Sequence, residues 1–203
     1  MYAVVENNNI TQFINYPKSI VIGDVRYPAK IFTMWSQAEK EAIGIYEIIT
    51  DSTNYKDPAY YINTNEQYNF ANGQVTKSWG TATPKRLEDE NAVDENGDPV
   101  LQDGVQVINY GLKTEKKRIV KQQASGLLAP TDWYVVKATE VADYDIPANI
   151  LSFRADVRTK SNEMETMINN CTTVDELKAL YEYTEQQDGT FTRPLPEFPK
   201  EVI

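Results

Sequence analysis

The segment after Pro147 most constrains the fold, because it holds the clearest helical periodicity in the chain. Apolar residues recur there at spacings of three, four and seven positions: Ile150, Phe153, Val157, Met164 and Ile168. This spacing places them on one face of a helix, although Lys160 interrupts the stripe. We therefore predict a long helix whose stripe packs in the core or against another helix.

Two helix starts are predicted around this stripe. In "APTDWYVV", Thr131 is a candidate N-cap, with Asp132 in the first turn to complement the positive end of the helix dipole. In "DIPANI", Asp145 is the candidate N-cap of the long helix, and Pro147 stands near its first positions, where a missing N–H costs little.

Two further helices are predicted on either side. The run "LKTEKKRIVKQQASGLL" is moderately amphipathic and is expected to end near Gly126 or Pro130. After the long helix, Thr173 and Glu176 have the spacing of a capping box and open a last helix. Its inner face is predicted to carry Leu177, Leu180 and Tyr181.

The first third of the chain reads as β-rich. "YAVVE" and "ITQFIN" flank three asparagines, residues 7–9, which tolerate the left-handed backbone of a hairpin turn. "SIVIGDVRYP" adds another strand, closed by Pro28, and residues 45–50 return to strand. Between them, Ser36 and Glu39 form a capping box for a short helix that Gly44 ends.

A second hairpin is predicted at Asn72-Gly73, between "QYNF" and "QVTKSW". Aromatic residues gather around it: Tyr60, Tyr61, Tyr68 and Trp79. A solvated sheet face is the favoured interpretation for them. Contact with a partner is the alternative, because interfaces are enriched in Tyr and Trp.

Residues 85–109 are polar, acidic and rich in turn formers, which favours a linker or a long loop. The fragment "DENGD" resembles the start of a calcium-binding loop, but Pro99 and Val105 occupy the positions that need Gly and Glu. A type I′ turn at Asn96-Gly97 accounts for it better.

The chain closes on a proline-rich stretch after Asp188-Gly189. Pro194, Pro196 and Pro199 favour an extended tail that docks on the body or reaches a partner. Together these patterns predict an α+β protein: an antiparallel, β-rich N-terminal half with one short helix, then an α-helical module and the extended tail. The predicted boundaries are 1–84 for the β-rich domain, 85–109 for the linker, 110–188 for the helical module and 189–203 for the tail.

Composition narrows the chemistry. The chain has no His, which removes Ser-His-Asp and Cys-His catalysis and His-ligated metals. Its single Cys171 cannot form an internal disulfide or a Cys-cluster zinc site, and we predict it to be a buried apolar side chain. The formal charge of −10 argues against nucleic-acid binding. The basic run from Lys113 to Lys121 is expected to be one solvated helix face.

No signature of an enzyme, cofactor site or metal site appears, so we expect no catalytic, cofactor or metal residues. Carboxylates are abundant enough that a glycan hydrolase is a third hypothesis, but Glu163, Glu165, Asp175 and Glu176 sit on predicted helices, where solvated charge is the ordinary role. "MYAVVENNN" shows no leader, and no apolar run is long enough to span a bilayer. We expect no membrane contact and a protein made in cytosol.

Arg154 and Arg158 are four residues apart and share a helix face. They could clasp a partner's carboxylates in forked ion pairs. Internal bridges to Asp156, Glu163 or the acidic loop are at least as well supported by the sequence.

Residues 112–199 resemble bacteriophage tail proteins of the tail-fibre-assembly and tail-assembly-chaperone kind. The motifs that carry the resemblance are "LLAPTDWYVV", "YDIPANI", "FRADVR" and the finish "RPLPEFP". Phe153 stands where that family usually has Tyr, Val157 where it has Leu, and Phe198 where Trp is common.

The resemblance implies a non-enzymatic virion tail component, part of a fibre, fibre adaptor or baseplate, synthesised in the cytoplasm of a bacterial host. The alternative is a chaperone that binds the fibre tip and assists its folding or trimerisation. Partners would be other tail proteins, a trimeric fibre or further copies of this chain. The predicted contact residues are Trp133, Tyr134, Phe153, Arg154, Arg158 and Phe198; for Trp133 and Phe153 a place in the core is the alternative.

Overall fold

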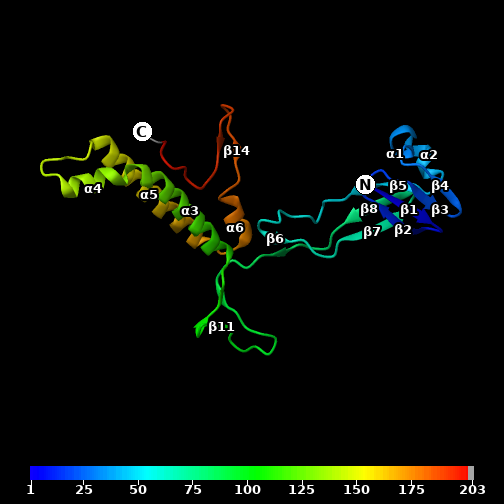
Figure 1. The fold of residues 1–203 in the computed structure, drawn as a ribbon, viewed down its shortest axis with the longest axis horizontal. Coiled ribbons are helices and arrows are strands. Elements are labelled where there is room, and N and C mark those ends of the chain that lie inside the picture. Colours follow the sequence, from blue (N-terminus) through cyan, green and yellow to red (C-terminus); the bar gives the residue numbers. More distant parts are fainter. Residues whose placement is uncertain (201–203) are drawn as a thin grey trace. The chain divides into compact units, whose positions relative to one another are not determined.

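A computed structural model describes residues 1–200, which group into two compact units, Met1–Pro84 and the chain from Lys85 onward (Figure 1). The strands of the first unit are β1 (Tyr2–Glu6), β2 (Asn9–Ile14), β3 (Ile20–Ile22), β4 (Val25–Tyr27), β5 (Ile45–Thr50), β6 (Tyr61–Ile62), β7 (Gln67–Ala71), β8 (Gln74–Ser78) and β9 (Thr83–Pro84). Its helices are α1 (Ile31–Met34) and α2 (Gln37–Glu41).

A five-stranded sheet in the order β2-β1-β5-β8-β7 forms the body of the first unit. Both predicted hairpins are present: Asn7 and Asn8 turn β1 into β2, and Asn72-Gly73 turns β7 into β8, all with positive φ. The sheet is mixed, however, because β5 pairs with β8 in parallel. The prediction of an antiparallel half is wrong at this pair, since the β7–β8 hairpin docks with its second strand inward.

The sheet carries an apolar cluster on each face. On one face Val4, Ile14 and Ile45 pack with Ile31 and Phe32 of α1. On the other face the core contains Ala3, Val5 and Val75, with partly buried Ile10, Tyr46, Ile48 and Phe70 around them. Strand alternation explains the division, because neighbouring residues of β1 point to opposite faces.

The two outer strands of this sheet approach each other across its second face. Phe13 of β2 and Tyr68 of β7 stack with ring centroids 4.5 Å apart. Deeper in the sheet, Tyr46 and Phe70 pair at 4.8 Å. The five strands therefore curl toward a small, partly closed barrel, and aromatic side chains close the gap between its edges.

Two local predictions in this unit need correction. The segment predicted as one strand is the hairpin β3–β4, because Gly23 turns the chain at φ +56°. A second helix, α1, precedes the predicted one; it is a single apolar turn without a side-chain cap. The expected capping box of Ser36 and Glu39 is confirmed in α2, and Gly44 follows that helix at φ +81°.

The aromatic residues around the second hairpin divide between surface and core. Tyr60 and Tyr61 are buried, so the prediction of a solvated sheet face is wrong for both. Tyr68 and Trp79 are half-buried. Lys77 covers both of these rings and forms an ion pair with Glu66 at 2.8 Å.

The second unit is mainly helical. Its helices are α3 (Leu112–Leu128), α4 (Asp132–Glu140), α5 (Ala148–Asn170) and α6 (Val174–Ala179), with the 3-10 turn η1 (Ala129–Thr131). Its strands are β10 (Glu90–Asn91), β11 (Leu101–Gln102), β12 (Val105–Gln106), β13 (Ile108–Asn109), β14 (Thr184–Glu185) and β15 (Phe191–Thr192).

Helices α3 and α5 lie side by side and hold the core of this unit (Figure 1). All five residues of the predicted stripe are buried, and buried Ser161 fills the place where Lys160 was expected to interrupt it. Val157 and Phe153 pack against Ala124 of α3. The long helix and its role as a helix-pair contact are thus confirmed.

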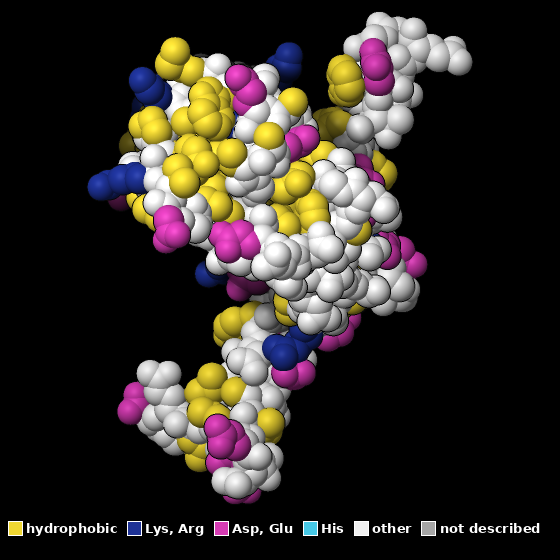
Figure 2. Space-filling view, turned by 90° about the vertical axis from the view of Figure 1, so that its right-hand side faces the viewer, with side chains coloured by type: hydrophobic (Ala, Val, Ile, Leu, Met, Phe, Trp, Pro, Cys, Tyr) yellow, Lys and Arg dark blue, Asp and Glu magenta, His cyan; other side chains and the backbone are white. Residues whose placement is uncertain are grey.

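Within residues 85–109, which were predicted as a linker or a long loop, residues 91–109 form a β-arm of short paired strands. β10 pairs with β13, and β11 pairs with β12 through a turn at Asp103-Gly104. In Figure 2 the arm, at the foot of the view, presents hydrophobic and acidic side chains together.

The turn within "DENGD" is not type I′. Gly97 has φ +87°, but Asn96 does not take the positive φ that type I′ requires. Instead Gly97 N–H donates to the Asp94 carbonyl at 3.1 Å, which defines a turn over residues 94–97. The Asp94 carboxylate accepts the N–H groups of Asn96 and Asp98, and these bonds hold its pKa below the usual range.

The capping box of α6 is confirmed: Thr173 and Glu176 bond reciprocally, and Leu177 is fully buried. The closing stretch starts with the hairpin β14–β15 and then docks on the helices. Leu195 is buried, its N–H donates to the Leu180 carbonyl at 3.0 Å, and Phe198 packs on the α3–α5 cluster. Residues 201–203 of the predicted tail lie outside the described residues.

Candidate protein-contact surface

Helix α4 is apolar and uncovered. It contains Trp133, Tyr134, Val135 and Val136, yet none of its nine residues is buried. Trp133 and Val136 are each 52% exposed, one helical turn apart. A helix of this composition normally packs in a core, so its exposure marks α4 as a candidate contact surface.

Aromatic rings stiffen this surface. The rings of Trp133 and Tyr134 lie 3.8 Å apart between centroids. The Lys137 ammonium stands over both Trp133 at 5.7 Å and Tyr144 at 4.2 Å. A rigid aromatic side chain loses little rotational freedom on binding, which suits these rings to a protein interface.

A buried arginine fixes α4 to the helix pair. Arg154 of α5 is 7% exposed, and its guanidinium donates to the hydroxyl of Thr131 and, at 3.1 Å, to the Leu128 carbonyl. Its other terminal nitrogen forms an ion pair with Asp132 at 2.8 Å. A buried guanidinium requires such partners, because leaving it unpaired costs several kcal/mol. The network therefore ties together the end of α3, the 3-10 turn and the first turn of α4.

The N-caps predicted for α4 and α5, Thr131 and Asp145, do not cap their helices through their side chains. Thr131 precedes α4 as expected, but its side chain makes no cap bond: its hydroxyl donates to Leu128 at 2.7 Å and accepts from Arg154. The N-cap of α5 is Pro147, not Asp145, which is exposed. The Thr131 hydroxyl is not free to cap α4 because it accepts a hydrogen bond from Arg154 of α5.

The remaining predicted contact residues take different places. Phe153 is 3% exposed and belongs to the core, so its contact role is wrong and the core alternative holds. For Trp133 the core alternative is wrong, because the ring is exposed. Arg154 serves an internal bridge to Asp132, an acceptor that the sequence argument did not name. Phe198 is half-buried against the helix pair.

Arg158 is the predicted residue that keeps donors free for a partner. It is exposed, and within residues 1–200 its one hydrogen bond is to the Arg154 carbonyl, at 3.3 Å. It lines a groove of about 420 Å³ between α3 and α5, with Lys121, Ser125 and Asn162 on its walls. This groove adjoins the Arg154 network, so Trp133 and Arg158 belong to the same end of the helical unit.

Other chemistry in the described residues is sparse. Cys171 is buried as predicted, and burial raises the pKa of its thiol. Within residues 1–200, no three His, Cys, Asp or Glu side chains converge as metal ligands would. None of the helices in that range is both long and apolar enough to cross a bilayer.

No protein-family model matches the chain, and no curated protein or solved structure is detectably similar to it.

Proposed function

We propose that this protein is a non-enzymatic component of a bacteriophage tail, in the fibre, its adaptor or the baseplate, and that it acts by binding other tail proteins. The observation that carries the proposal is the uncovered apolar helix α4, held in place by the buried Arg154 network. The motif resemblance of residues 112–199 to tail-assembly proteins supplies the setting, because "TDW" and "FRADVR" are the segments that build this surface.

The apolar side chains of α4 are left exposed to solvent, and a binding partner that covers them would account for this exposure. Trp133, Val136 and Val141 are exposed. The Lys137 ammonium stands over the Trp133 ring, and Arg158 lines a groove that includes Asp132, the residue before Trp133. An apolar centre with a polar rim is the usual anatomy of a protein interface. Tryptophan and arginine are also the residues that contribute most to binding free energy.

The first test is to analyse purified particles of the encoding phage by mass spectrometry. The proposal expects this protein in stoichiometric amounts with the tail subunits. Absence from intact virions would reject a structural role.

A second test locates the contact. The double change W133A/V136D is expected to abolish incorporation into tails while the purified chain keeps its helical circular dichroism. The matched control is Val21→Asp in the first unit, where Val21 is 58% exposed. Equal loss in both variants would argue that α4 has no special role.

The assembly chaperone is the second candidate, favoured by the same exposed helix, because a chaperone needs an apolar surface that it can release. Co-expression with the neighbouring fibre gene should then raise the yield of soluble fibre, and mature particles should lack the protein. Unchanged fibre yield argues against the chaperone.

A further inference from the structure

The β-arm, residues 91–109, projects from the helices of the second unit (Figure 1). Its root joins the start of α3 through residues 86–89. Leu112 N–H donates to the Arg86 carbonyl at 2.9 Å, and Lys113 N–H donates to the Leu87 carbonyl at 3.1 Å. A helix start leaves such donors without partners inside the helix, and here the incoming chain satisfies them.

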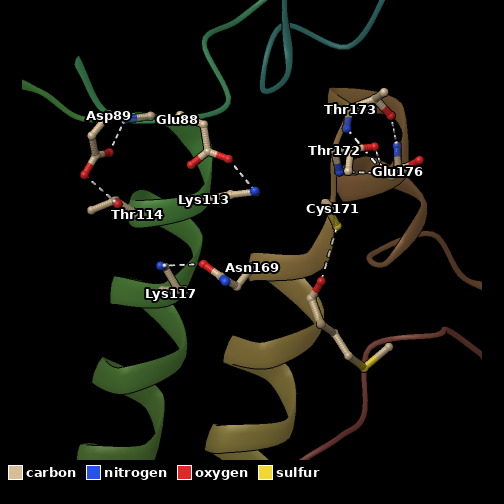
Figure 3. Close-up of polar contacts among 12 residues, drawn as sticks. Glu88, Asp89, Lys113, Thr114, Lys117, Asn169, Cys171, Thr172, Thr173 and Glu176 are labelled. Carbon is tan, nitrogen blue, oxygen red and sulfur yellow. Dashed lines mark hydrogen bonds and ion pairs between the residues drawn. The ribbon is translucent and has the colours of Figure 1, made fainter.

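Side chains reinforce this root (Figure 3). The Asp89 carboxylate accepts from Gly111 N–H at 2.7 Å and from the Thr114 hydroxyl at 2.9 Å. Buried Lys113 forms an ion pair with Glu88. A Cβ at Gly111 would lie 2.4 Å from the Glu88 backbone, so the two segments are in close contact.

Polar contacts also order the arm itself. The Gln106 side-chain amide lies 2.9 Å from the Ala92 carbonyl, 2.9 Å from the Val107 carbonyl and 3.2 Å from the Val100 carbonyl. The Asp94 carboxylate holds the turn over residues 94–98 by accepting the N–H groups of Asn96 and Asp98. The arm thus has a defined shape before it meets any partner, which lowers the entropic cost of binding.

The surface of the arm is apolar and acidic. Val105 is 69% exposed and Leu101 and Val93 are each 59% exposed. The arm has four carboxylates, Asp94, Glu95, Asp98 and Asp103, and contains no Lys or Arg. A two-stranded ribbon has no second layer of its own to cover such residues.

The complementary surface is on α3 of the same chain. Five of the 20 Lys and Arg residues lie between Lys113 and Lys121. Three cations, Lys117, Arg118 and Lys121, and one carboxylate, Glu115, line a groove of about 500 Å³ with Tyr110 and Thr114. The ring of Tyr110 and the long side-chain stems give this groove apolar walls beneath its positive charge.

Each cation of this groove has a contact within its own chain. Lys121 pairs with the partly buried Glu165 at 3.2 Å, and the contacts of the other two are exposed. Arg118 pairs with Glu115 at 2.8 Å on the same helix, and Lys117 reaches Asn169 at 3.4 Å. Exposed pairs of this kind contribute at most about 1 kcal/mol. They can be exchanged for carboxylates of an incoming segment at little cost.

We propose that the β-arm of one copy docks in the α3 groove of a second copy, so that the chain self-associates. Glu95 and Asp98 would face Lys117 and Arg118, while Leu101 and Val105 would be covered by Tyr110 and the side-chain stems. The arm and groove are different surfaces, so their contact closes either as a reciprocal pair or as a small ring. This inference stands apart from the tail proposal, because it concerns the purified chain alone.

Charge exchange tests the pairing. We would measure the mass of the full chain in solution by size-exclusion chromatography with light scattering, for the wild type, E95K/D98K and K117E/R118E. The wild type is expected to form a dimer or larger closed oligomer. Each variant alone is expected to give the 23.1 kDa monomer, because arm and groove then carry like charges.

An equimolar mixture of the two variants is the decisive sample. In it a basic arm meets an acidic groove and an acidic arm meets a basic groove, so the wild-type mass should return. The matched control E6K/D24K reverses two exposed charges of the first unit and should keep the wild-type mass. Circular dichroism establishes that all variants are folded.

Three results would overturn the proposal: a wild type that is monomeric at every concentration, an oligomer that both variants retain, or a mixture that stays monomeric.

Discussion

Helices α5 and α4 come from neighbouring segments of sequence and are both rich in apolar residues, yet they end in opposite environments. α5 buries seven residues along its 23, including Phe153 and Val157. α4 buries none along its nine. The difference lies in their partners: α5 runs beside α3 along its length, whereas the polar bonds that join α4 to the pair are at its start, through Asp132 and the preceding Thr131.

Apolar content alone therefore does not determine whether a helix is buried. A stripe sustained over many turns has a matching helix to pack against, and its burial follows from its period. A helix shorter than three turns has too few apolar residues on one face for their periodicity to determine where the helix packs. Its position is determined by specific polar bonds, here those of Arg154.

The largest expected effect tests the buried side of this comparison. Phe153→Ala should lower the free energy of unfolding of the helical unit by about 3–5 kcal/mol, because it removes a buried ring and leaves a cavity. Urea denaturation followed by circular dichroism at 222 nm measures it. The control is Leu151→Ala on the same helix, where Leu151 is 51% exposed and about 0.5 kcal/mol or less is expected. Similar costs for the two variants would contradict the contrast.

The next effect tests the link between the two helices. Arg154→Ala should cost about 2–3 kcal/mol, because it strips the buried Thr131 hydroxyl and the half-buried Leu128 carbonyl of their charged donor. It should also speed amide hydrogen exchange across α4, since the bonds that orient that helix are gone. Arg158→Ala, which removes one bond of 3.3 Å, should change neither measurement appreciably. Unchanged exchange in Arg154→Ala would show that α4 is held by other means.

Helix α6 sharpens the comparison, because it is shorter than α4 and still buries Val174 and Leu177. Its start is fixed by a capping box that α4 lacks. Thr173→Ala should therefore cost about 1 kcal/mol in the free energy of unfolding. Thr166→Ala, at an exposed position near the end of α5, serves as the control and should be close to neutral. A neutral Thr173→Ala would mean that burial alone places α6.

The same box predicts a dependence on pH. The N–H and hydroxyl of Thr172 donate to the Glu176 carboxylate and lower its pKa from the ordinary value of 4.5. Because the folded pKa is the lower one, the stabilisation is present above pH 4.5 and is lost as the pH falls through the folded pKa. An NMR titration of the Glu176 carboxyl group measures this. Glu176→Gln should remove that part of the acid sensitivity, and a normal or raised pKa would contradict the prediction.

The smallest expected effect tests the exposed side. Trp133→Ala should change the free energy of unfolding by no more than about 0.5 kcal/mol, since the ring lies on the surface. The measurement is the same urea titration. A cost near that of Phe153→Ala would place Trp133 in a core and remove the basis of the proposed contact surface.

Much of the fold could be predicted where the signal is local. Asn72-Gly73, the Ser36–Glu39 box and the Thr173–Glu176 box each specify a turn or helix start within four residues, and all three are confirmed. The stripe of α5 was predictable because its spacing is sustained from Ile150 to Ile168.

The errors occur where distant residues decide. Thr131 has the sequence of a cap, but Arg154, 23 positions further on, takes its hydroxyl. The parallel pairing of β5 with β8 depends on how a whole hairpin docks, which no single strand encodes. The exposure of Trp133 likewise depends on what its helix meets, so sequence could name the residue without deciding between core and contact.

The curled sheet of the first unit has a consequence for aggregation when the protein is concentrated. Its outer strands would otherwise offer unpaired backbone groups to another chain, the common route to aggregation. The tilted rings of Phe13 and Tyr68, 4.5 Å apart between centroids, bring the two margins together, and we expect this to limit the access of a foreign strand. Such a seam would keep this unit from seeding insoluble aggregates when the protein is concentrated.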